Sequence, residues 1–496
     1  MSDDHHPGAE TAGKSRPAAT VAAVRAAVAG HAPDFLADLR DWVSIPSISA
    51  DSRHHADVVE SARWLAEALR RDGWPLVEVW DTTSAGPMLP AVHACWPAED
   101  PDAPVVLVYA HHDVQPVDPV TAWDHPPFEA VLVGDELFGR GVSDDKGQVL
   151  MHLLALRAHL DATGRTAPAV TVKLLVEGEE ESASPNLARL LADHADALAC
   201  DLVVVSDTQL LGRDTPSVCV GMRGLADAEV VFHGAASDLH SGQFGGAVVN
   251  PAVALAKLLA ALHDDDGRVA IPGFYDDVRD PDPAERAAFA RLPFDEAAWL
   301  AGPGAGASAW GEAGWSTLER LWVRPTVEVN GVHSGYTGPG VKTVVPRQAT
   351  AKLTFRLVPG QRVARVLDLL RDFVAARTPH GVRSEVRTGR GGFDPAVVEP
   401  GDPATGAVVD ALRMVFDHDI VPARSGGSGP AALLTDALGA PLVFLGAGLS
   451  GDHVHAPNER VAVPLLHRGA EAAAVLWDLL PGRLARAGGG TEEHTA

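Results

Sequence analysis

The sequence predicts an α/β fold in which a mostly parallel sheet presents polar side chains at one edge. Segments with helical spacing of apolar residues alternate with short apolar strands along much of the chain. Several of these strands end in His, Asp or Glu, and the apolar residues 105–109 lead directly into His111 and Asp113. Ligands of such sheets bind beyond the carboxyl ends of the strands, so we expect the functional site at that edge.

The composition is that of a globular protein whose length suits two domains. Its formal net charge of −26 argues against nucleic acids and anionic membrane surfaces as partners. Three cysteines, Cys95, Cys200 and Cys219, form no C-x-x-C pair, which predicts a reducing, cytoplasmic location without a disulfide framework. No apolar run is long enough to span a bilayer, and residues 1–20 lack the features of a secretory signal.

The first part of the chain contains two predicted helices, at residues 21–45 and 58–72, followed by strands. Strands at residues 76–80 and 91–96 lead to residues 105–109, whose unbroken apolar character predicts burial on both faces. The two side chains that follow, His111 and Asp113, point the same way on an extended chain. Taken alone, this pair is equally compatible with an ordinary polar loop after a strand.

The same pattern recurs in the next segments. A glycine-rich loop at residues 139–147 precedes a predicted helix at residues 148–160. The apolar strand at residues 170–176 ends in four glutamates within residues 177–181, and a further apolar strand ends at Asp207. A strand end that carries this many carboxylates is electrostatically costly unless a cation lies nearby, although a solvated acidic loop is the alternative.

A second, α+β domain is predicted after residue 220, where the composition changes. Its expected elements are strands at residues 226–233 and 350–358 and helices at residues 251–263 and 363–377. Residues 269–331 are rich in Pro, Gly and Asp and are expected to be irregular. The chain then returns to helices at residues 402–416 and 463–480, with a strand at residues 442–445 between them.

These elements predict a main domain built from two segments, with the second domain inserted between them. The predicted parts are a disordered tail (1–20), the first part of the main domain (21–220), the inserted domain (221–392), the second part of the main domain (393–483) and a second disordered tail (484–496).

Taken together, the motifs resemble the M20 family of zinc peptidases and deacylases, and within it the carnosinase-like and cytosolic nonspecific dipeptidases. The matching segments follow the family order and include YAHHDVQP at residues 109–116, GRGVSDDKG at 139–147 and EGEEES at 177–182, together with residues 206–207, 238–242, 271–278 and 455–459. A single motif would not identify a family, whereas this ordered set does. The resemblance implies a zinc-peptidase-like catalytic domain and an inserted lid and dimerisation domain.

The resemblance also implies a centre of two divalent cations, with zinc the expected metal and manganese or cobalt as alternatives. His111 and Asp207 would hold one cation, Glu181 and His455 would hold the other, and Asp144 would bridge both. These residue types suit the chemistry, because zinc takes imidazole nitrogen and carboxylate oxygen and keeps a position open in catalytic sites.

Further catalytic roles follow from the same resemblance. Glu180 would act as general base for a water shared by the two cations, while Asp113 would orient the ring of His111. His240 would stabilise the oxyanion from the inserted domain of a partner subunit, so a homodimer is expected.

The resemblance places a substrate carboxylate at Arg356, with Thr343, Gly427 and Ser428 also lining the pocket. In place of a histidine that relatives carry before two glycines, this sequence has Arg390, which would add charge near the substrate.

The predicted function is therefore metal-dependent hydrolysis of the peptide bond of dipeptides or short peptides. An N-acyl amino acid deacylase or a carboxypeptidase on the same scaffold is the alternative, and residues 271–331 favour the dipeptidase branch. A catalytically inactive binding protein is a remote alternative, because none of the expected ligands is missing, nor is Glu180. The chain lacks a phosphate-binding glycine loop of the form that a nucleotide or redox enzyme would need.

Overall fold

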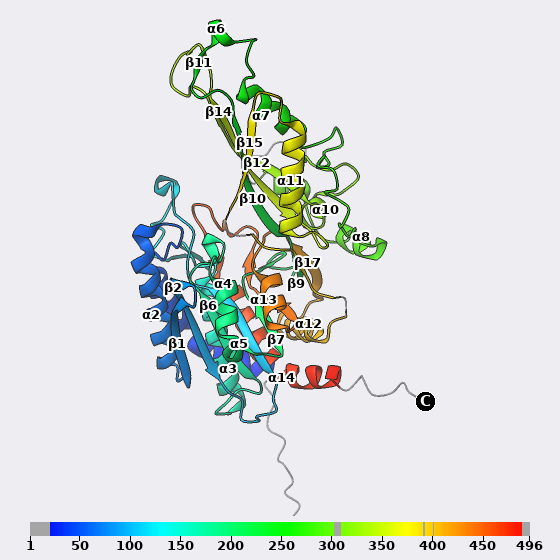
Figure 1. Ribbon diagram of the computed structural model, residues 1–496. Helices are drawn as coiled ribbons and strands as arrows, with labels where there is room; N and C mark the ends of the chain where they lie inside the picture. The colour runs from blue at the N-terminus through cyan, green and yellow to red at the C-terminus, as the bar shows by residue number, and fades with distance from the viewer. Residues whose placement is uncertain (1–19, 302–308, 390–391, 400, 489–496) are drawn as a thin grey trace, which may run out of the picture.

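The computed structural model describes residues 20–301, 309–389, 392–399 and 401–488 and shows two connected lobes (Figure 1). A large lobe is built on a six-stranded sheet, and a small lobe on a four-stranded sheet stands above it in Figure 1. Helices and strands alternate along much of the large lobe, so the predicted α/β class is confirmed.

The central sheet of the large lobe is mixed, and its parallel strands lie next to one another. In spatial order its strands are β1 (Leu76–Thr83), β2 (Gly86–Trp96), β6 (Thr171–Glu177), β3 (Val105–His111), β7 (Leu202–Val205) and β18 (Leu442–Phe444). The first two pairings are antiparallel, whereas β6, β3, β7 and β18 run parallel. The carboxyl ends of these four strands therefore meet at one edge of the sheet.

Helices cover both faces of this sheet. The helices on one face are α1 (Val21–Val43), α2 (His55–Arg71), α3 (Lys146–Thr163), α12 (Pro403–Phe416) and α14 (Val463–Gly488), and those on the other are α4 (Leu187–Asp193), α5 (Ala195–Leu198) and α13 (Ala431–Leu438). Along β3, Val106 and Val108 pack in the first core, while Leu107 and Tyr109 pack in the second. The strand is thus buried on both faces, as its apolar run predicted.

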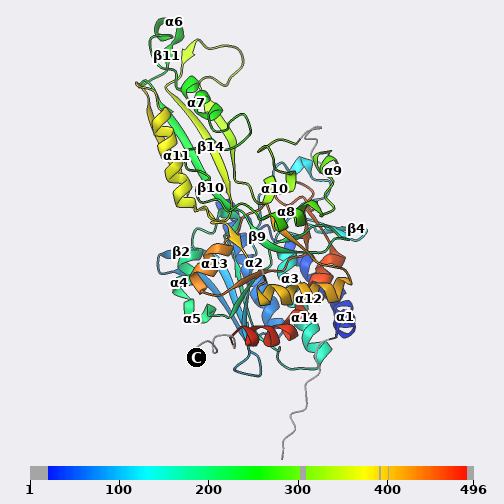
Figure 2. The same ribbon diagram turned by 90° about the vertical axis from the view of Figure 1, so that its right-hand side faces the viewer.

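The small lobe is an antiparallel sheet with helices on one face. Its strands, in spatial order, are β12 (Thr326–Ser334), β14 (Gln348–Leu357), β10 (Gly224–His233) and β15 (Arg383–Thr388). Helices α7 (Pro251–Ala260) and α11 (Val363–Arg377) pack on the apolar face of β10 and β14. The tip of this lobe, which holds β11 (Leu239–His240), α6 (Ser241–Phe244) and β13 (Val344–Val345), lies at the end farthest from the large lobe (Figures 1 and 2).

Residues 269–331, which were expected to be irregular, are more ordered than their composition indicated. This segment contains α8 (Pro283–Ala290), α9 (Glu296–Ala301) and α10 (Thr317–Trp322) and most of β12. The guanidinium of Arg324 lies 5.1 Å from the ring centre of Tyr275 and 4.4 Å from that of Trp315. It also pairs with Glu312, with 2.8 Å between Nη2 and Oε1. Stacking and charge pairing therefore order a segment that has little apolar periodicity.

Smaller sheets complete the large lobe and its junction with the small lobe. They are β9 (Ser217–Met222) with β16 (Ala396–Val397) and β17 (Val421–Ser425), β5 (Glu136–Phe138) with β4 (Val131–Val133) and β20 (Arg460–Ala462), and β8 (Gln209–Leu210) with β19 (Gly448–Leu449). The small lobe is formed by the chain between β9 and β16, and we propose that it corresponds to the predicted inserted domain, residues 221–392.

The predicted tails and the three cysteines can also be compared with the structure. Helix α14 continues to Gly488, past the predicted start of the second tail at residue 484. The rest of that tail, and residues 1–19 of the first, lie outside the described residues. Cys95, Cys200 and Cys219 are all free thiols. Among the helices of the described ranges, none combines the length and the hydropathy needed to cross a bilayer.

Candidate metal centre and substrate pocket

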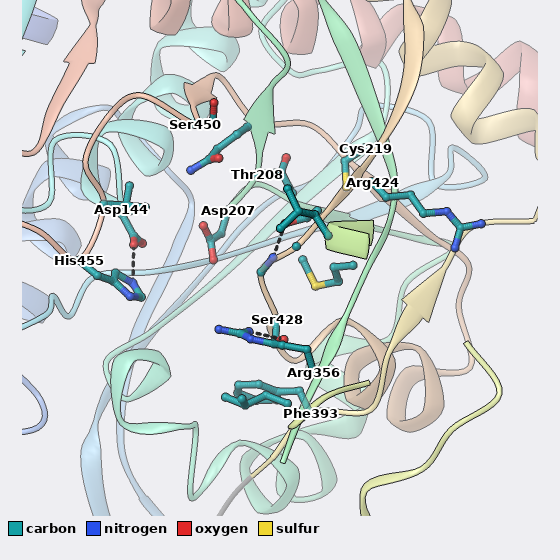
Figure 3. Close-up of a pocket in the computed structure, with 18 of the residues that line it drawn as sticks. Asp144, Asp207, Thr208, Cys219, Arg356, Phe393, Arg424, Ser428, Ser450 and His455 are labelled. Carbon is teal, nitrogen blue, oxygen red and sulfur yellow. Dashed lines mark hydrogen bonds and ion pairs between the residues drawn. The ribbon is translucent and has the colours of Figure 1, made fainter. Parts of the chain in front are cut away.

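The predicted metal ligands gather at the carboxyl edge of the central sheet. His111 ends β3, Asp207 follows β7, and Asp144 lies in the glycine-rich loop before α3. Glu181 lies in a short 3₁₀ turn after β6, and His455 lies in the loop before β20. Figure 3 shows the carboxylates of Asp144 and Asp207 and the ring of His455 directed toward a common space.

Asp144 is shared between two groups of donor atoms. Its Oδ1 lies 3.0 Å from His111 Nε2, and its Oδ2 lies 3.0 Å from His455 Nε2. Asp207 Oδ2 lies 3.9 Å from His111 Nε2, and Glu181 Oε2 lies 3.3 Å from His455 Nε2. In each group of three residues, the candidate ligand atoms lie within 4.8 Å of one another. The arrangement is two adjacent groups joined by one carboxylate.

The donor set fits divalent cations. His111 Nε2 is buried and has no hydrogen-bond partner, although carboxylate oxygens lie near it. A buried polar atom left without a partner costs free energy, and a bound cation would satisfy it. Imidazole nitrogen and carboxylate oxygen are ligands of zinc, and three protein donors per group leave positions open for water and substrate. The residues present therefore fit two divalent cations.

The pKa values of the cluster reveal an excess of negative charge. Burial and the neighbouring Asp144 raise the pKa of Glu181, and the same two causes raise the pKa of Asp207 to about 7. Burial would also raise the pKa of Asp144, but the nearby rings of His111 and His455 outweigh it and hold this pKa below its ordinary value. Against the effect of burial, Asp144 and Glu181 raise the pKa of His455 to about 11. Bound cations would relieve the repulsion among these carboxylates.

Asp113 and Gln115, which follow His111, hold in place the turn that carries Glu180 and Glu181. The carboxylate of Asp113 accepts hydrogen bonds from the backbone N–H groups of Glu180, at 3.2 Å, and Glu181, at 3.0 Å. Its Oδ1 lies 3.5 Å from His111 Nδ1, and its carbonyl oxygen lies 3.1 Å from the same nitrogen. Gln115 Nε2 donates to Glu181 Oε2 at 2.6 Å. No role for Gln115 was predicted from the sequence, although this residue follows Asp113 by two positions.

Glu180 lies beside a ligand without belonging to either group of donors. It lines the pocket, whereas the two groups use Glu181 from the same turn. Burial raises the pKa of Glu180 well above its ordinary value, and Glu181 and Asp207 add to this effect while His111 opposes it. A half-buried carboxylate that lines the pocket and belongs to neither group of candidate ligands has the position that a general base requires.

A cavity of about 540 Å³ extends from the metal-ligand groups to the junction of the lobes (Figure 3). Arg356, Gly427 and Ser428 line it, and Arg356 Nη1 donates to Ser428 Oγ at 2.8 Å. The wall also contains a group of apolar side chains, Leu210, Leu211, Met222, Leu225, Leu321 and Trp322. The structure therefore brings three of the four predicted substrate-binding residues into the pocket.

His240 and Thr343 lie elsewhere in the chain. Both are exposed at the tip of the small lobe, where the Ser241 N–H donates to the Thr343 carbonyl at 3.0 Å. His240 Nδ1 accepts a hydrogen bond from the Gly242 N–H at 3.0 Å. Neither residue is among the described residues that line the pocket of its own chain. Arg390, the predicted departure from the family pattern, lies outside the described residues.

A buried ion pair behind Asp144 has a role that sequence reasoning missed. Glu459 Oε2 lies 2.7 Å from Arg140 Nη1, and both side chains are buried. Glu459 Oε1 accepts hydrogen bonds at 3.0–3.2 Å from three backbone N–H groups, those of Gly141, Ser143 and Asp144. Glu459 thus ties the segment that carries His455 to the loop that carries Asp144. Both segments belong to recognised motifs, but their contact is formed only by the fold.

Comparison with known proteins gives matches over both lobes. The model of peptidase family M20/M25/M40 matches residues 107–478. The Cys-Gly metallodipeptidase DUG1 of Saccharomyces cerevisiae is 29% identical over 452 residues, which cover 87% of this chain and 92% of the relative. The human Beta-Ala-His dipeptidase is 28% identical over 449 residues, which cover 87% of each chain.

Solved structures agree with these matches. The structure of the dipeptidase Dug1p from Saccharomyces cerevisiae aligns with a TM-score of 0.82 at 26% identity, over 94% of this chain and 99% of that one. The M20 family metallo-carboxypeptidase Sso-CP2 from Sulfolobus solfataricus aligns with a TM-score of 0.79 at 31% identity, over 90% of this chain and 99% of that one.

Replacement of Glu459 by Gln is expected to weaken Zn²⁺ binding by about 10- to 100-fold, because the loop of Asp144 loses its charged anchor to Arg140. The dissociation constant, measured by competition with a chelator, tests this expectation, and circular dichroism verifies that the variant is folded. Glu67→Gln, on an exposed position of α2, is the matched control and should leave the affinity unchanged. A folded Glu459→Gln variant with wild-type affinity would contradict this role.

Proposed function

The chain belongs to peptidase family M20/M25/M40, and on that premise we propose that it is a metal-dependent hydrolase that cleaves the peptide bond of dipeptides and other short peptides. The proposal rests on the carboxylate of Asp144, which belongs to two adjacent groups of candidate metal-ligating residues. These groups lie at one end of a pocket, and Arg356 lies at the other end. The names of two relatives, a Cys-Gly metallodipeptidase and a Beta-Ala-His dipeptidase, support dipeptides as the substrate class.

We propose that His111 and Asp207 hold one cation, that Glu181 and His455 hold the other, and that Asp144 binds both. The distances within each group of residues support this assignment. Zinc is the proposed metal, and a carboxylate-rich site of this kind also suits manganese or cobalt. When bound, the cations supply Lewis-acid polarisation to water and to the substrate carbonyl.

Glu180 is the proposed general base. Its place in the pocket beside Glu181 lets its carboxylate accept a proton from the attacking water and return it to the leaving amine. Asp113 supports this task, because its carboxylate accepts hydrogen bonds from the backbone N–H groups of Glu180 and Glu181. These bonds fix Glu180 relative to the proposed ligands. It also orients the ring of His111, whose Nδ1 lies near both its carboxylate and its carbonyl oxygen.

Arg356 is the proposed binding group for the C-terminal carboxylate of the substrate, with Ser428 and Gly427 beside it. Among the described residues, no carboxylate forms an ion pair with Arg356, and burial lowers its pKa. A half-buried guanidinium without an acidic partner favours an anionic ligand, which it can bind through two parallel N–H donors. A substrate carbonyl near the cations and a carboxylate near Arg356 would fit a short peptide.

A carboxypeptidase is the second candidate, because one related structure is that of an M20 family metallo-carboxypeptidase. Recognition of a terminal carboxylate by Arg356 serves a carboxypeptidase as well as a dipeptidase. An N-acyl amino acid deacylase would use the same carboxylate contact.

A cytoplasmic location is part of the proposal and rests on the three free cysteines.

A substrate panel tests the reaction class. Metal-stripped enzyme is expected to be inactive, and added Zn²⁺ or Mn²⁺ should restore cleavage of alanyl-alanine and β-alanyl-histidine. The C-terminal amide of alanyl-alanine should be cleaved about 100-fold less efficiently, because it cannot pair with Arg356. Cleavage of N-acetyl amino acids alone would indicate a deacylase, and stepwise trimming of long peptides would indicate a carboxypeptidase. Activity that persists without metal would contradict the proposal.

Replacement of Glu180 by Gln is expected to lower kcat by about 10²- to 10⁴-fold, because the amide cannot accept the proton from water. The KM for alanyl-alanine and the Zn²⁺ content should change little, since Gln preserves the shape of Glu180 and the ligand set is intact. Steady-state kinetics and atomic absorption measure the two quantities on one preparation. A kcat within tenfold of wild type at full metal content would remove Glu180 from the base role.

We propose that the chain works as a homodimer in which the tip of one small lobe completes the pocket of the other chain. His240 and Thr343 are exposed at this tip, away from the pocket of their own chain. The same tip exposes large apolar side chains, and Phe244, Tyr336 and Val341 have exposed fractions of 41%, 47% and 94%. Exposed apolar groups of this kind favour burial against a partner.

Mixing two inactive variants tests this arrangement. Glu180→Gln lacks the base and His240→Ala lacks the tip histidine, so each homodimer should be inactive. After subunit exchange, a mixed dimer has one pocket with both residues intact, which should restore about a quarter of wild-type activity by random pairing. Size-exclusion chromatography with light scattering gives the oligomeric state. A mixture that stays inactive although exchange has occurred, or a monomer with full activity, would contradict the proposal.

A further inference from the structure

Arg223 is a buried cation at the point where the chain passes from the large lobe to the small lobe. It lies between β9 and β10, and only 7% of its surface is exposed. No carboxylate of the described residues forms an ion pair with it. Burial and the positive charge of Arg356 lower the pKa of Arg223 to about 9, and the negative charge of Glu328 opposes them. Burying a cation without an acidic partner costs folding free energy. We therefore expect Arg223 to have a role that offsets this cost.

The donors of Arg223 go to backbone carbonyl groups of the loop that lines the pocket and of α10. Its Nε donates to the Gly426 carbonyl at 3.1 Å, and its Nη1 lies 3.5 Å from the Arg320 carbonyl at the end of α10. Its backbone N–H donates to the Ser425 carbonyl at 3.3 Å. Arg223 therefore joins three segments: the lobe junction, α10 and the glycine loop, which we define as residues 425–428.

The glycine loop is tightly enclosed at Gly426. A Cβ atom on Gly426 would lie 3.2 Å from the Leu321 carbonyl oxygen and 3.3 Å from Arg223 Nη2. The loop is thus held between the guanidinium and the end of α10, with little room for a side chain. Farther along the same loop, Ser428 faces the pocket and contacts Arg356 (Figure 3).

We propose that Arg223 is a positioning residue that fixes the glycine loop, and thereby sets the geometry in which Ser428 and Arg356 bind the carboxylate of the substrate. This inference rests on the hydrolase function proposed above. The charge of Arg223 also acts on the same end of the pocket, because its guanidinium interacts electrostatically with that of Arg356. A substrate with a free carboxylate therefore gains from Arg223, whereas its amide gains much less.

Kinetics on alanyl-alanine and its C-terminal amide test this role. Arg223→Gln is expected to raise KM for the free dipeptide about tenfold, with kcat within about threefold of wild type, and to reduce the preference for the free dipeptide over the amide. Arg223→Lys keeps the charge but loses the fork of donors, so its KM should be intermediate. A purely structural defect would affect both substrates equally, and that outcome would overturn the inference.

Arg371→Gln is the matched control, because it removes an exposed guanidinium of the small lobe, on α11, which lies 2.6 Å from Asp368 and does not line the pocket. Its KM values should stay close to wild type. If Arg223→Gln fails to fold, Arg223→Lys alone decides, and an unchanged KM and an unchanged preference in this variant would overturn the inference.

Binding without turnover separates this inference from the proposed function. Calorimetric titration of alanyl-alanine into the Zn²⁺-loaded Glu180→Gln variant is compared with the same titration after Arg223→Gln is added. About tenfold weaker binding in the double variant supports the role of Arg223. Equal titrations, including two that show no binding, would overturn it. If the wild type cleaves no dipeptide, the proposed function fails, while this comparison still decides the role of Arg223.

Discussion

The carboxylate of Asp144 is the constraint on which the candidate centre depends. It lies between the rings of His111 and His455, so a shift of its loop would disturb both groups of donors at once. Glu459 prevents such a shift, because one of its carboxylate oxygens accepts hydrogen bonds from three backbone N–H groups of that loop. Glu459 and His455 come from the second segment of the large lobe, whereas Asp144 comes from the first. The centre can therefore form only when the two segments have packed together.

The pocket adds a second fixed point to this centre. The candidate metal-ligating residues and Glu180 lie at one end, and Arg356 with Ser428 lies at the other. Arg223 links this second end to α10, whose last residues also line the wall. The segment around α10 is ordered by stacking of Arg324 between Tyr275 and Trp315. On the proposed function, structural order around α10, away from the candidate metal centre, would help to determine where a substrate lies.

The sequence predicted those features that leave a local signal. An unbroken apolar run identified β3 as a strand buried on both faces, and His111 and Asp207 were expected at the ends of apolar strands, which the structure pairs side by side. The order around Arg324 escaped prediction, because stacking of cations on rings has no periodicity along the chain. The role of Glu459 also escaped it, because its partners lie in a distant segment. His240 stays a prediction, since its proposed pocket belongs to another chain.

Anomalous X-ray diffraction from crystals loaded with Zn²⁺ would test the central claim most directly. Two cations that share Asp144 predict two anomalous peaks, one on each side of its carboxylate, the first next to His111 and Asp207 and the second next to Glu181 and His455. A separation of about 3.5–4 Å between the peaks is typical of two-metal hydrolytic sites. A single peak at saturating Zn²⁺, or peaks remote from Asp144, would contradict a shared two-cation centre.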